Sequence, residues 1–331
     1  METIGITGTL PIEVLYAAGL CVADLNNLFV VSPDAHQGIE YAERDGFPKT
    51  YCPWIKGIYW ATLKNGIKQV VIAGSDCAHS RVLGEILQFR GVKIHRFDYP
   101  YPADKDALSR EFKRFCDEFG VSLIACEKMK KRLDETRKLL QRLDELTYTT
   151  HQVRGEENHQ FLLAASDFCQ DPDAYHRKVA NFLSEAEHRP TKNLDIRIAY
   201  LGVPPIISDL YRFLESLGAD VVFNEMQRQF AMIPPSDNLI EQYFRFTYPY
   251  EFEHRFKDIE TQCRLRKIDG IIHYTQSFCF RQAHTILLKE SLKKARLEIP
   301  VLVLEADLPS PLSAQQKTRL EAFIEMLRFN K

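Results

Sequence analysis

Three of the eight cysteines stand at or shortly before the start of a predicted helix, and they are the residues of this chain best placed for chemistry. Cys77 follows the apolar run VVIA and a small turn, and Cys279 follows the apolar run DGIIHYT in the other half of the chain. Cys52 precedes Pro53, a residue suited to the first turn of a helix. The positive end of a helix lowers the pKa of a thiol and favours the thiolate that binds metal. The three cysteines therefore share one chemical setting.

The spacing of these cysteines restricts the metal group that they could hold. A structural zinc site needs four ligands and usually contains a close C-x₂₋₄-C pair, which this sequence lacks. An iron-sulfur cubane carries its own bridging sulfides and accepts thiolates from distant parts of a chain. Three thiolates would leave one iron for a substrate or a solvent ligand. The alternative from spacing alone is that all three are ordinary buried cysteines.

The elements that must position these cysteines follow an alternating pattern. Short apolar runs alternate with helical stretches along the 331 residues, as expected for parallel sheets covered by helices. The sequence predicts strands at 67–74 and 92–100 and helices at 52–66, 80–91 and 106–120. It predicts a first α/β domain at 1–125, a helical segment at 126–190 and a second α/β domain at 191–331.

Composition excludes several classes of protein. The chain has 43 basic and 45 acidic residues, a net charge of −2 and no block of lysine and arginine, so nucleic acid is a poor candidate partner. No apolar run approaches the length of about 18 residues that a membrane span needs. The first residues lack a basic region followed by an apolar signal core. We therefore expect a cytoplasmic protein that contacts neither nucleic acid nor membrane.

Six segments in order carry a resemblance to a known family. They are GTLPIEVLYAAG (8–19), YCPWIKGIYW (51–60), AGSDC (73–77), KIDGIIHYTQSFC (267–279), IPVLVLEADLP (299–309) and QQKTRLEAFIEML (315–327). Together they resemble the 2-hydroxyacyl-CoA dehydratase D-component and benzoyl-CoA reductase family, which includes the double-cubane-cluster proteins. The resemblance implies an α/β fold of two similar Rossmann-like (flavodoxin-like) parallel-sheet domains, with a cluster site in the cleft between them.

The resemblance also implies a cofactor and partners. The three cluster cysteines of the family fall on Cys52, Cys77 and Cys279, which would bind a 4Fe-4S cluster, with a double cubane as the alternative. An ATP-hydrolysing iron-sulfur activator would supply a low-potential electron. The substrate would be an acyl-CoA or another small molecule, and a homodimer or a homologous subunit is expected. The implied activity is that of a dehydratase (lyase) or a reductase. The alternatives are a double-cubane-type reductase of small molecules and a non-catalytic electron-relay or scaffold subunit.

Other residues near the motifs are candidates for supporting roles. The catalytic candidates are Glu13, Ser75 and His79, while Asp76 is interpreted as a helix cap.

Three further candidates have two interpretations each. Cys21 is a fourth ligand or a core residue, His273 is a site residue or a hydrogen-bonded core histidine, and Lys56 is a counter-charge to the cluster or a solvated cation. Glu305 and Asp307 are expected at the carboxyl end of a strand, and Tyr51, Trp54 and Trp60 around Cys52 are interpreted as an apolar wall.

Overall fold

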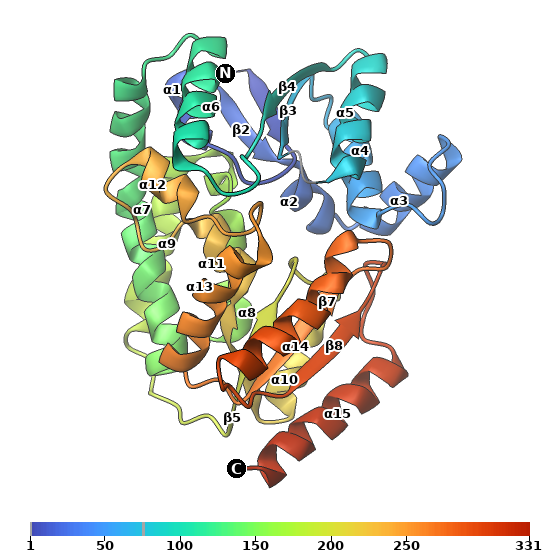
Figure 1. The fold of residues 1–331 in the computed structure, drawn as a ribbon, viewed down its shortest axis with the longest axis vertical. Helices are drawn as coiled ribbons and strands as arrows, with labels where there is room; N and C mark the ends of the chain where they lie inside the picture. The colour runs from blue at the N-terminus through green and yellow to red at the C-terminus, as the bar shows by residue number, and fades with distance from the viewer. Residues whose placement is uncertain (1, 75–76) are drawn as a thin grey trace. The chain divides into compact units, whose positions relative to one another are not determined.

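Two sheets of four parallel strands organise the chain, one in each of two units (Figure 1). The structure is a computed structural model that describes residues 2–74 and 77–331. Unit 1 comprises Met1–Lys138, Ala164–Lys178 and Phe230–Glu251, and unit 2 comprises Leu139–Leu163, Val179–Gln229 and Phe252–Lys331. The sequence predicted domain boundaries at residues 125 and 190, which would make each domain one continuous stretch of chain. In the structure, each unit consists of three separate stretches. The reason is that α7 (Leu123–Thr149) and the segments after it contribute residues to both units.

The sheet of unit 1 has the order β2-β1-β3-β4. Its strands are β1 (Thr3–Ile6), β2 (Cys21–Asp24), β3 (Gln69–Ala73) and β4 (Lys93–Phe97), and all neighbours are parallel. Successive strands are therefore added on opposite sides of β1, and the order reverses between β1 and β3. Parallel strands buried on both faces explain why these runs are apolar and rich in valine and isoleucine.

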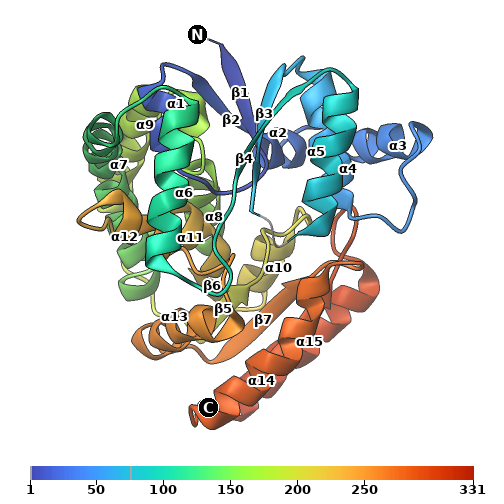
Figure 2. The same cartoon turned by 45° about the horizontal axis from the view of Figure 1, so that its top comes forward.

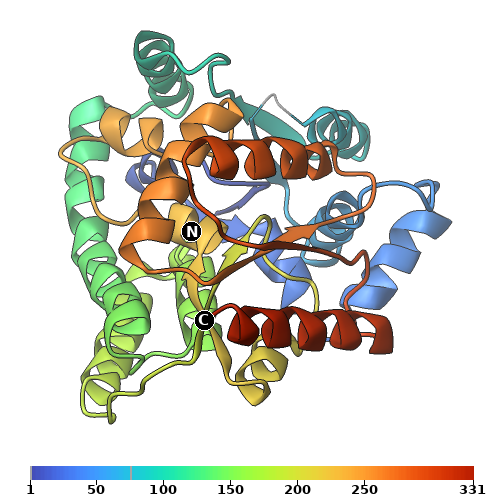
Figure 3. The same ribbon diagram turned by 60° about the horizontal axis from the view of Figure 1, so that its bottom comes forward.

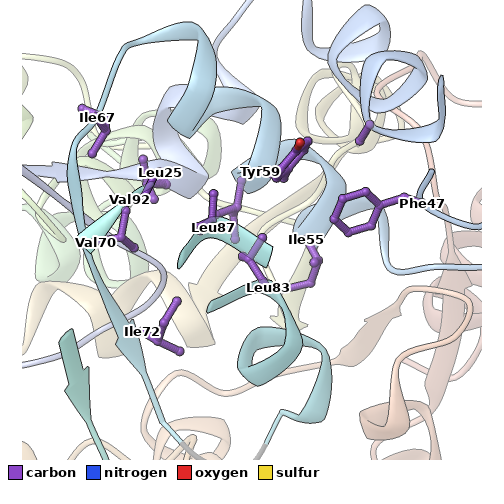
Figure 4. Packing of buried hydrophobic residues seen from close by; sticks show 12 residues of the cluster. Leu25, Phe47, Ile55, Tyr59, Ile67, Val70, Ile72, Leu83, Leu87 and Val92 are labelled. Atoms are coloured by element: carbon purple, nitrogen blue, oxygen red, sulfur yellow. The ribbon is translucent and has the colours of Figure 1, made fainter. Parts of the chain in front are cut away.

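Helices cover both faces of this sheet (Figure 2). They are α1 (Ile12–Ala17), α2 (Leu25–Val30), α3 (Ala35–Arg44), α4 (Pro53–Lys64), α5 (Ala78–Phe89) and α6 (Lys105–Glu118). On one face α4 and α5 bury apolar side chains against β3, including Ile55, Leu83 and Ile72 (Figure 4). On the other face, α6 packs aromatic rings against Phe97 of β4. Unit 1 also holds the 3₁₀ turn η1 (Phe168–Gln170) and α12 (Leu239–Phe244).

The sheet of unit 2 repeats the topology of the first, with the order β6-β5-β7-β8. Its strands are β5 (Ile196–Leu201), β6 (Ala219–Asn224), β7 (Gly270–Thr275) and β8 (Val301–Glu305), again all parallel. The strand order of this sheet reverses between β5 and β7. The predicted α/β fold class with two similar Rossmann-like sheets is therefore confirmed.

The helices of unit 2 lie on both faces of its sheet (Figure 3). They include α8 (Gly155–Ala164), α10 (Leu210–Ser216), α13 (Phe252–Leu265), η2 (Phe280–Ala283), α14 (His284–Lys294) and α15 (Ala314–Phe329). A core of α13 and α14 packs on one face of β7. Against the other face, α15 packs so closely that a Cβ atom on Gly270 would lie 2.5 Å from Leu327.

Two further helices, α9 (Pro172–Ala186) and α11 (Glu225–Ala231), contribute residues to both units. The longest helix, α7, has 27 residues and carries charged side chains along its length. Within the described ranges, no helix combines the length and the apolar character that crossing a membrane would require.

Candidate functional site

The two sheets place a cysteine at the same point of their topology. Ligands of open parallel sheets gather outside the carboxyl ends of the strands, at the position where the strand order reverses. In unit 1 that position is the end of β3, and Cys77 follows it; in unit 2 it is the end of β7, and Cys279 follows it. Each unit therefore presents one thiol at its expected ligand-binding edge.

Cys77 occupies the N-cap position of α5. Its carbonyl accepts a hydrogen bond from the N–H of Arg81 (3.3 Å), which closes the first turn of the helix. The side chain is half-buried at a helix end whose partial positive charge favours a thiolate. The predicted catalytic residue Ser75 and the predicted cap Asp76 lie outside the described residues.

Cys52 occupies the N-cap position of α4, with Pro53 as the first helical residue. Cys52 is also half-buried, and it packs together with Tyr51 against the core between α4 and α5. The helix is held close to α2, because a Cβ atom on Gly57 would lie 2.4 Å from the ring of Phe29. Glycine at this position thus lets α4 pack closely against α2. None of the eight cysteines, all within the described ranges, forms a disulfide.

An aromatic contact joins the beginnings of α4 and α5. The rings of Tyr51 and His79 are stacked, with centroids 4.3 Å apart and planes 27° apart. Burial raises the pKa of the Tyr51 phenol, and the negative charges of Cys77 and Cys52 raise it further. Both thiols therefore act electrostatically on one phenol. Unit 1 brings Cys52, Cys77 and the predicted catalytic residue His79 to one place.

Glu13 lies in a different environment from the one that its candidate catalytic role suggests. Its side chain is fully buried and accepts hydrogen bonds from Arg137 (2.7 Å) and from the hydroxyl of Tyr243 (2.7 Å). Arg137 also pairs with Asp134, which in turn pairs with Lys130. Glu13 is thus the first member of a buried ionic chain along α7 rather than a solvent-accessible acid.

Lys56 and Cys21 are likewise placed by unit 1. Lys56 is buried and binds Glu43 at 2.7 Å, so it neither extends to solvent nor leaves its charge unbalanced. Cys21 pairs with Thr3 at the amino end of β2, whereas Cys77 follows the carboxyl end of β3. At 3.3 Å per strand residue, these two ends are about 15 Å apart. Unit 1 therefore does not support Cys21 as a ligand beside Cys77.

In unit 2, acidic side chains hold the turn that carries Cys279. Asp307 accepts a hydrogen bond from the N–H of Ser277 (2.8 Å), and Glu305 accepts one from the Ser277 hydroxyl. Phe278 adopts a left-handed backbone (φ 65°), which non-glycine residues rarely adopt. The predicted position of Glu305 and Asp307 at the carboxyl end of a strand is confirmed, and their role is to fix the approach to Cys279.

A buried ionic group that the sequence did not reveal lies at the same edge of unit 2. Arg255 of α13 binds both carboxylate oxygens of Glu225, at 2.5 and 2.7 Å, and Glu225 also accepts from the N–H of Gly202. Gly202 has φ of 105°, and a Cβ atom there would lie 2.3 Å from the carbonyl oxygen of Tyr274. The glycine therefore permits the close approach of β5 to β7 at the strand ends.

Two histidines complete this group. His273 is buried and its Nδ1 lies 2.8 Å from the Thr285 hydroxyl, which confirms the interpretation of a hydrogen-bonded core histidine. His284 is half-buried at the start of α14, with Nδ1 3.3 Å from Arg255. Burial lowers the pKa of His284 to about 4, and the charge of Arg255 acts in the same direction. His284 is therefore a neutral imidazole whose Nδ1 accepts and whose Nε2–H is left as a donor.

The predicted cysteine ligands are thus divided between the units. Cys52 and Cys77 belong to unit 1 and Cys279 belongs to unit 2, and their convergence on one cluster stays a prediction. The local chemistry of each fits a thiolate ligand, since each is half-buried and stands at the N-cap of a helical segment.

Comparisons with known proteins agree with the motif positions. A family model described as 2-hydroxyglutaryl-CoA dehydratase, D-component, matches residues 8–327. A sequence comparison with curated proteins found no match. The match spans nearly the whole chain and includes every segment on which the resemblance rests. The chain therefore belongs to the 2-hydroxyglutaryl-CoA dehydratase D-component family.

Proposed function

We propose that this protein is the iron-sulfur component of an activator-driven 2-hydroxyacyl-CoA dehydratase or benzoyl-CoA-reductase-like system. Cys52, Cys77 and Cys279 would bind a 4Fe-4S cluster. The observation that carries this proposal is the repeated position of Cys77 and Cys279, each the fourth residue after the strand at which its sheet reverses order. Family membership supports a dehydratase-type component as the setting.

The residues around the unit 1 cysteines fit such a cluster. A cluster needs thiolates, a shell that limits the access of water, and polar groups that tune it. Two helix N-termini favour the thiolates of Cys52 and Cys77, and the buried rings of Trp54 and Trp60 lie on the helix that Cys52 begins. When bound, the cluster would supply low-potential electron transfer and a Lewis-acidic iron.

The chain's own side chains would hold and orient the reacting groups. His79, kept in place by its stack on Tyr51, can hydrogen-bond a substrate oxygen or a cluster sulfide. Ser75 is proposed for the same role on the basis of its position two residues before Cys77. Glu13 enters the proposal as a positioning residue, since Arg137 and Tyr243 already occupy its carboxylate.

The proposal includes two protein partners. An ATP-hydrolysing iron-sulfur activator would deliver the electron, and a second copy or a homologous subunit would complete the enzyme. The substrate would be an acyl-CoA or another small molecule. Turnover is expected only with reduced activator, ATP and substrate together under anaerobic conditions.

Iron and sulfide content after anaerobic purification tests the proposal. About four iron atoms per chain are expected for a single cubane. About eight would favour a double-cubane-type reductase instead. A chain that binds neither iron nor sulfide, even after anaerobic reconstitution, would overturn the proposal in favour of a non-catalytic scaffold subunit.

Single substitutions test the ligand assignment. Cys52→Ser, Cys77→Ser and Cys279→Ser should each lose iron while the far-UV circular dichroism spectrum is kept, because the core is built from the apolar strands. Cys263→Ser and Cys116→Ser are the controls, since both cysteines are buried within helices. Equal loss of iron from ligand and control variants would show general misfolding and remove the assignment.

A further inference from the structure

Two buried thiols outside the candidate site are in direct contact. The Sγ atoms of Cys116 and Cys126 lie 3.8 Å apart, ten residues apart in the chain. Cys116 is in the last turn of α6 and Cys126 is in the first turn of α7. Their side chains are 3% and 0% exposed. The pair therefore joins two consecutive helices of unit 1 at their corner.

The backbone of this corner holds the pair together. The N–H of Val121 donates to the carbonyl of Cys116 (3.0 Å), which ends α6. The N–H of Cys126 donates to the carbonyl of Ser122 (3.1 Å), which begins α7. Between them Gly120 takes the left-handed conformation (φ 65°) that reverses the chain. The sulfurs are thus held near each other by a short, hydrogen-bonded turn, so bond formation needs a small movement of two side chains.

We propose that Cys116 and Cys126 form a dithiol that hydrogen peroxide oxidises reversibly to a disulfide. The thiolate of one cysteine would attack one peroxide oxygen, which forms a sulfenic acid on that cysteine and releases water after proton uptake. The sulfur of the other cysteine would then attack the sulfur of the sulfenic acid and release a second water. Two thiols and one peroxide give one disulfide and two waters, so the peroxide takes up two electrons and two protons.

The contact between the two thiols allows either sulfur to act first. Either sulfur can donate the hydrogen bond that joins them. Whichever thiol forms the sulfenic acid, the other lies 3.8 Å away and can resolve it.

The experiment uses the full chain, reduced under anaerobic conditions and then exposed to hydrogen peroxide. Samples are quenched with alkylating reagent in denaturant and digested with trypsin, which releases both cysteines in one peptide, FCDEFGVSLIACEK (115–128). The expected product is that peptide without alkylation and with a mass two hydrogen atoms below that of the reduced peptide. Treatment with dithiothreitol before alkylation should restore both thiols. Cleavage after Asp117 or Glu118 should then leave two fragments linked by the disulfide.

Cys263 provides the matched control, because it is also buried in a helix, at 1% exposure. We expect the Cys116–Cys126 disulfide to form at least about tenfold faster than any disulfide of Cys263, because the second thiol is already in place. Cys126→Ser and Cys116→Ser should each prevent the disulfide, and in at least one of the two variants a dimedone probe should trap the remaining cysteine as a sulfenic acid. The proposal is overturned if both thiols remain alkylatable when Cys263 has reacted, or if the disulfide appears only in denatured chain.

Discussion

The imidazole of His79 is stacked on the phenol ring of Tyr51, with centroids 4.3 Å apart and planes 27° apart. Tyr51 directly precedes Cys52, and His79 lies two residues after Cys77. This stack therefore links the beginnings of two helices that each carry a proposed ligand. It also places the imidazole of His79 against the Tyr51 phenol, whose pKa is raised by the charges of both Cys77 and Cys52 in addition to burial.

Removal of the Tyr51 ring should weaken cluster binding. We expect Tyr51→Ala to lose about half or more of its iron and sulfide during anaerobic gel filtration, because His79 and the two helix ends lose their common contact; stacked aromatic pairs contribute about 1 kcal/mol. Tyr51→Phe keeps the ring and should retain iron as the unmodified chain does. The measurement is iron and sulfide per chain before and after the column.

Tyr41 supplies the control for this comparison. It also stacks on an aromatic ring, that of Tyr59, but it is exposed and lies in α3. Tyr41→Ala should retain iron. If Tyr51→Ala and Tyr51→Phe bind iron equally well, the stack has no role in holding the ligand pair.

The buried pair of Glu225 and Arg255 should be costly to break. Glu225→Gln removes the charge that balances Arg255, and both side chains are at most 2% exposed. Loss of one partner of a buried ion pair typically costs about 3–5 kcal/mol of stability. Urea unfolding followed by circular dichroism should show a loss of about this size.

An exposed ion pair gives the comparison. Arg264 and Glu260 pair along α13 at 52% and 33% exposure. Glu260→Gln should change the free energy of unfolding by less than about 0.5 kcal/mol. Similar effects of the two substitutions would show that the Glu225 pair does not stabilise unit 2.

The element that carries Cys77 could be predicted because its signals are local. An apolar run, a small turn and an amphipathic helix follow one another within about twenty residues, and each pattern depends on near neighbours. The same holds for β7 and the helix after Cys279. The family motifs then fell on the same three cysteines that these local patterns had identified.

Other features had no local signal. The first strand, Thr3–Ile6, is only four residues long and was not predicted, although β1 lies at the centre of its sheet. The short helices α2, α11 and α12 were also missed, since six or seven residues give too few turns for a periodic pattern. Strand order depends on pairing between distant segments, so the reversal that places Cys77 and Cys279 could not be inferred from either run.

The buried ionic groups were missed for the same reason. Glu225 and Arg255 are 30 residues apart, and Glu13 and Arg137 are 124 apart. Each residue taken alone resembles an ordinary solvated charge on a helix. Glu13 was a catalytic candidate because of its place in the first motif, whereas its partners come from helices elsewhere in unit 1.

A buried carboxyl pair in unit 1 should make stability depend on pH. Asp167 accepts a hydrogen bond from the N–H of Asp24 (2.8 Å), and both side chains are buried. Burial, followed by the charge of Asp24, raises the pKa of Asp167 to about 7. At pH values between the ordinary pKa of 3.8 and about 7, Asp167 carries a proton in the folded chain and has released it in the unfolded chain. Stability from this group is therefore complete at low pH and is lost as the pH rises towards 7.

Asp167→Asn should flatten this dependence, because the amide stays neutral. The free energy of unfolding measured at pH 5 and pH 8 should differ less in the variant than in the unmodified chain, by a few kcal/mol at most. Asp173→Asn is the control, since that exposed carboxyl pairs with Arg132 at the surface. An unchanged pH dependence in Asp167→Asn would contradict the raised pKa.

His284 should remain neutral throughout the physiological range. Burial and the nearby guanidinium of Arg255 lower the pKa of His284 to about 4, so a proton on this ring would add a second positive charge beside the first. Nitrogen-15 NMR of labelled protein, with the signal assigned by its loss in His284→Gln, should show a neutral ring between pH 5 and 8. The Nε2–H tautomer is expected, because Nδ1 faces the donor Arg255.

A neutral His284 ring can donate a hydrogen bond to a carbonyl oxygen at the edge of the sheet that carries Cys279. Because the ring does not ionise above pH 5, it cannot contribute to the pH dependence of activity in that range. A titration midpoint near the ordinary value of 6.5, or a signal from the Nδ1–H tautomer, would show that Arg255 does not control His284.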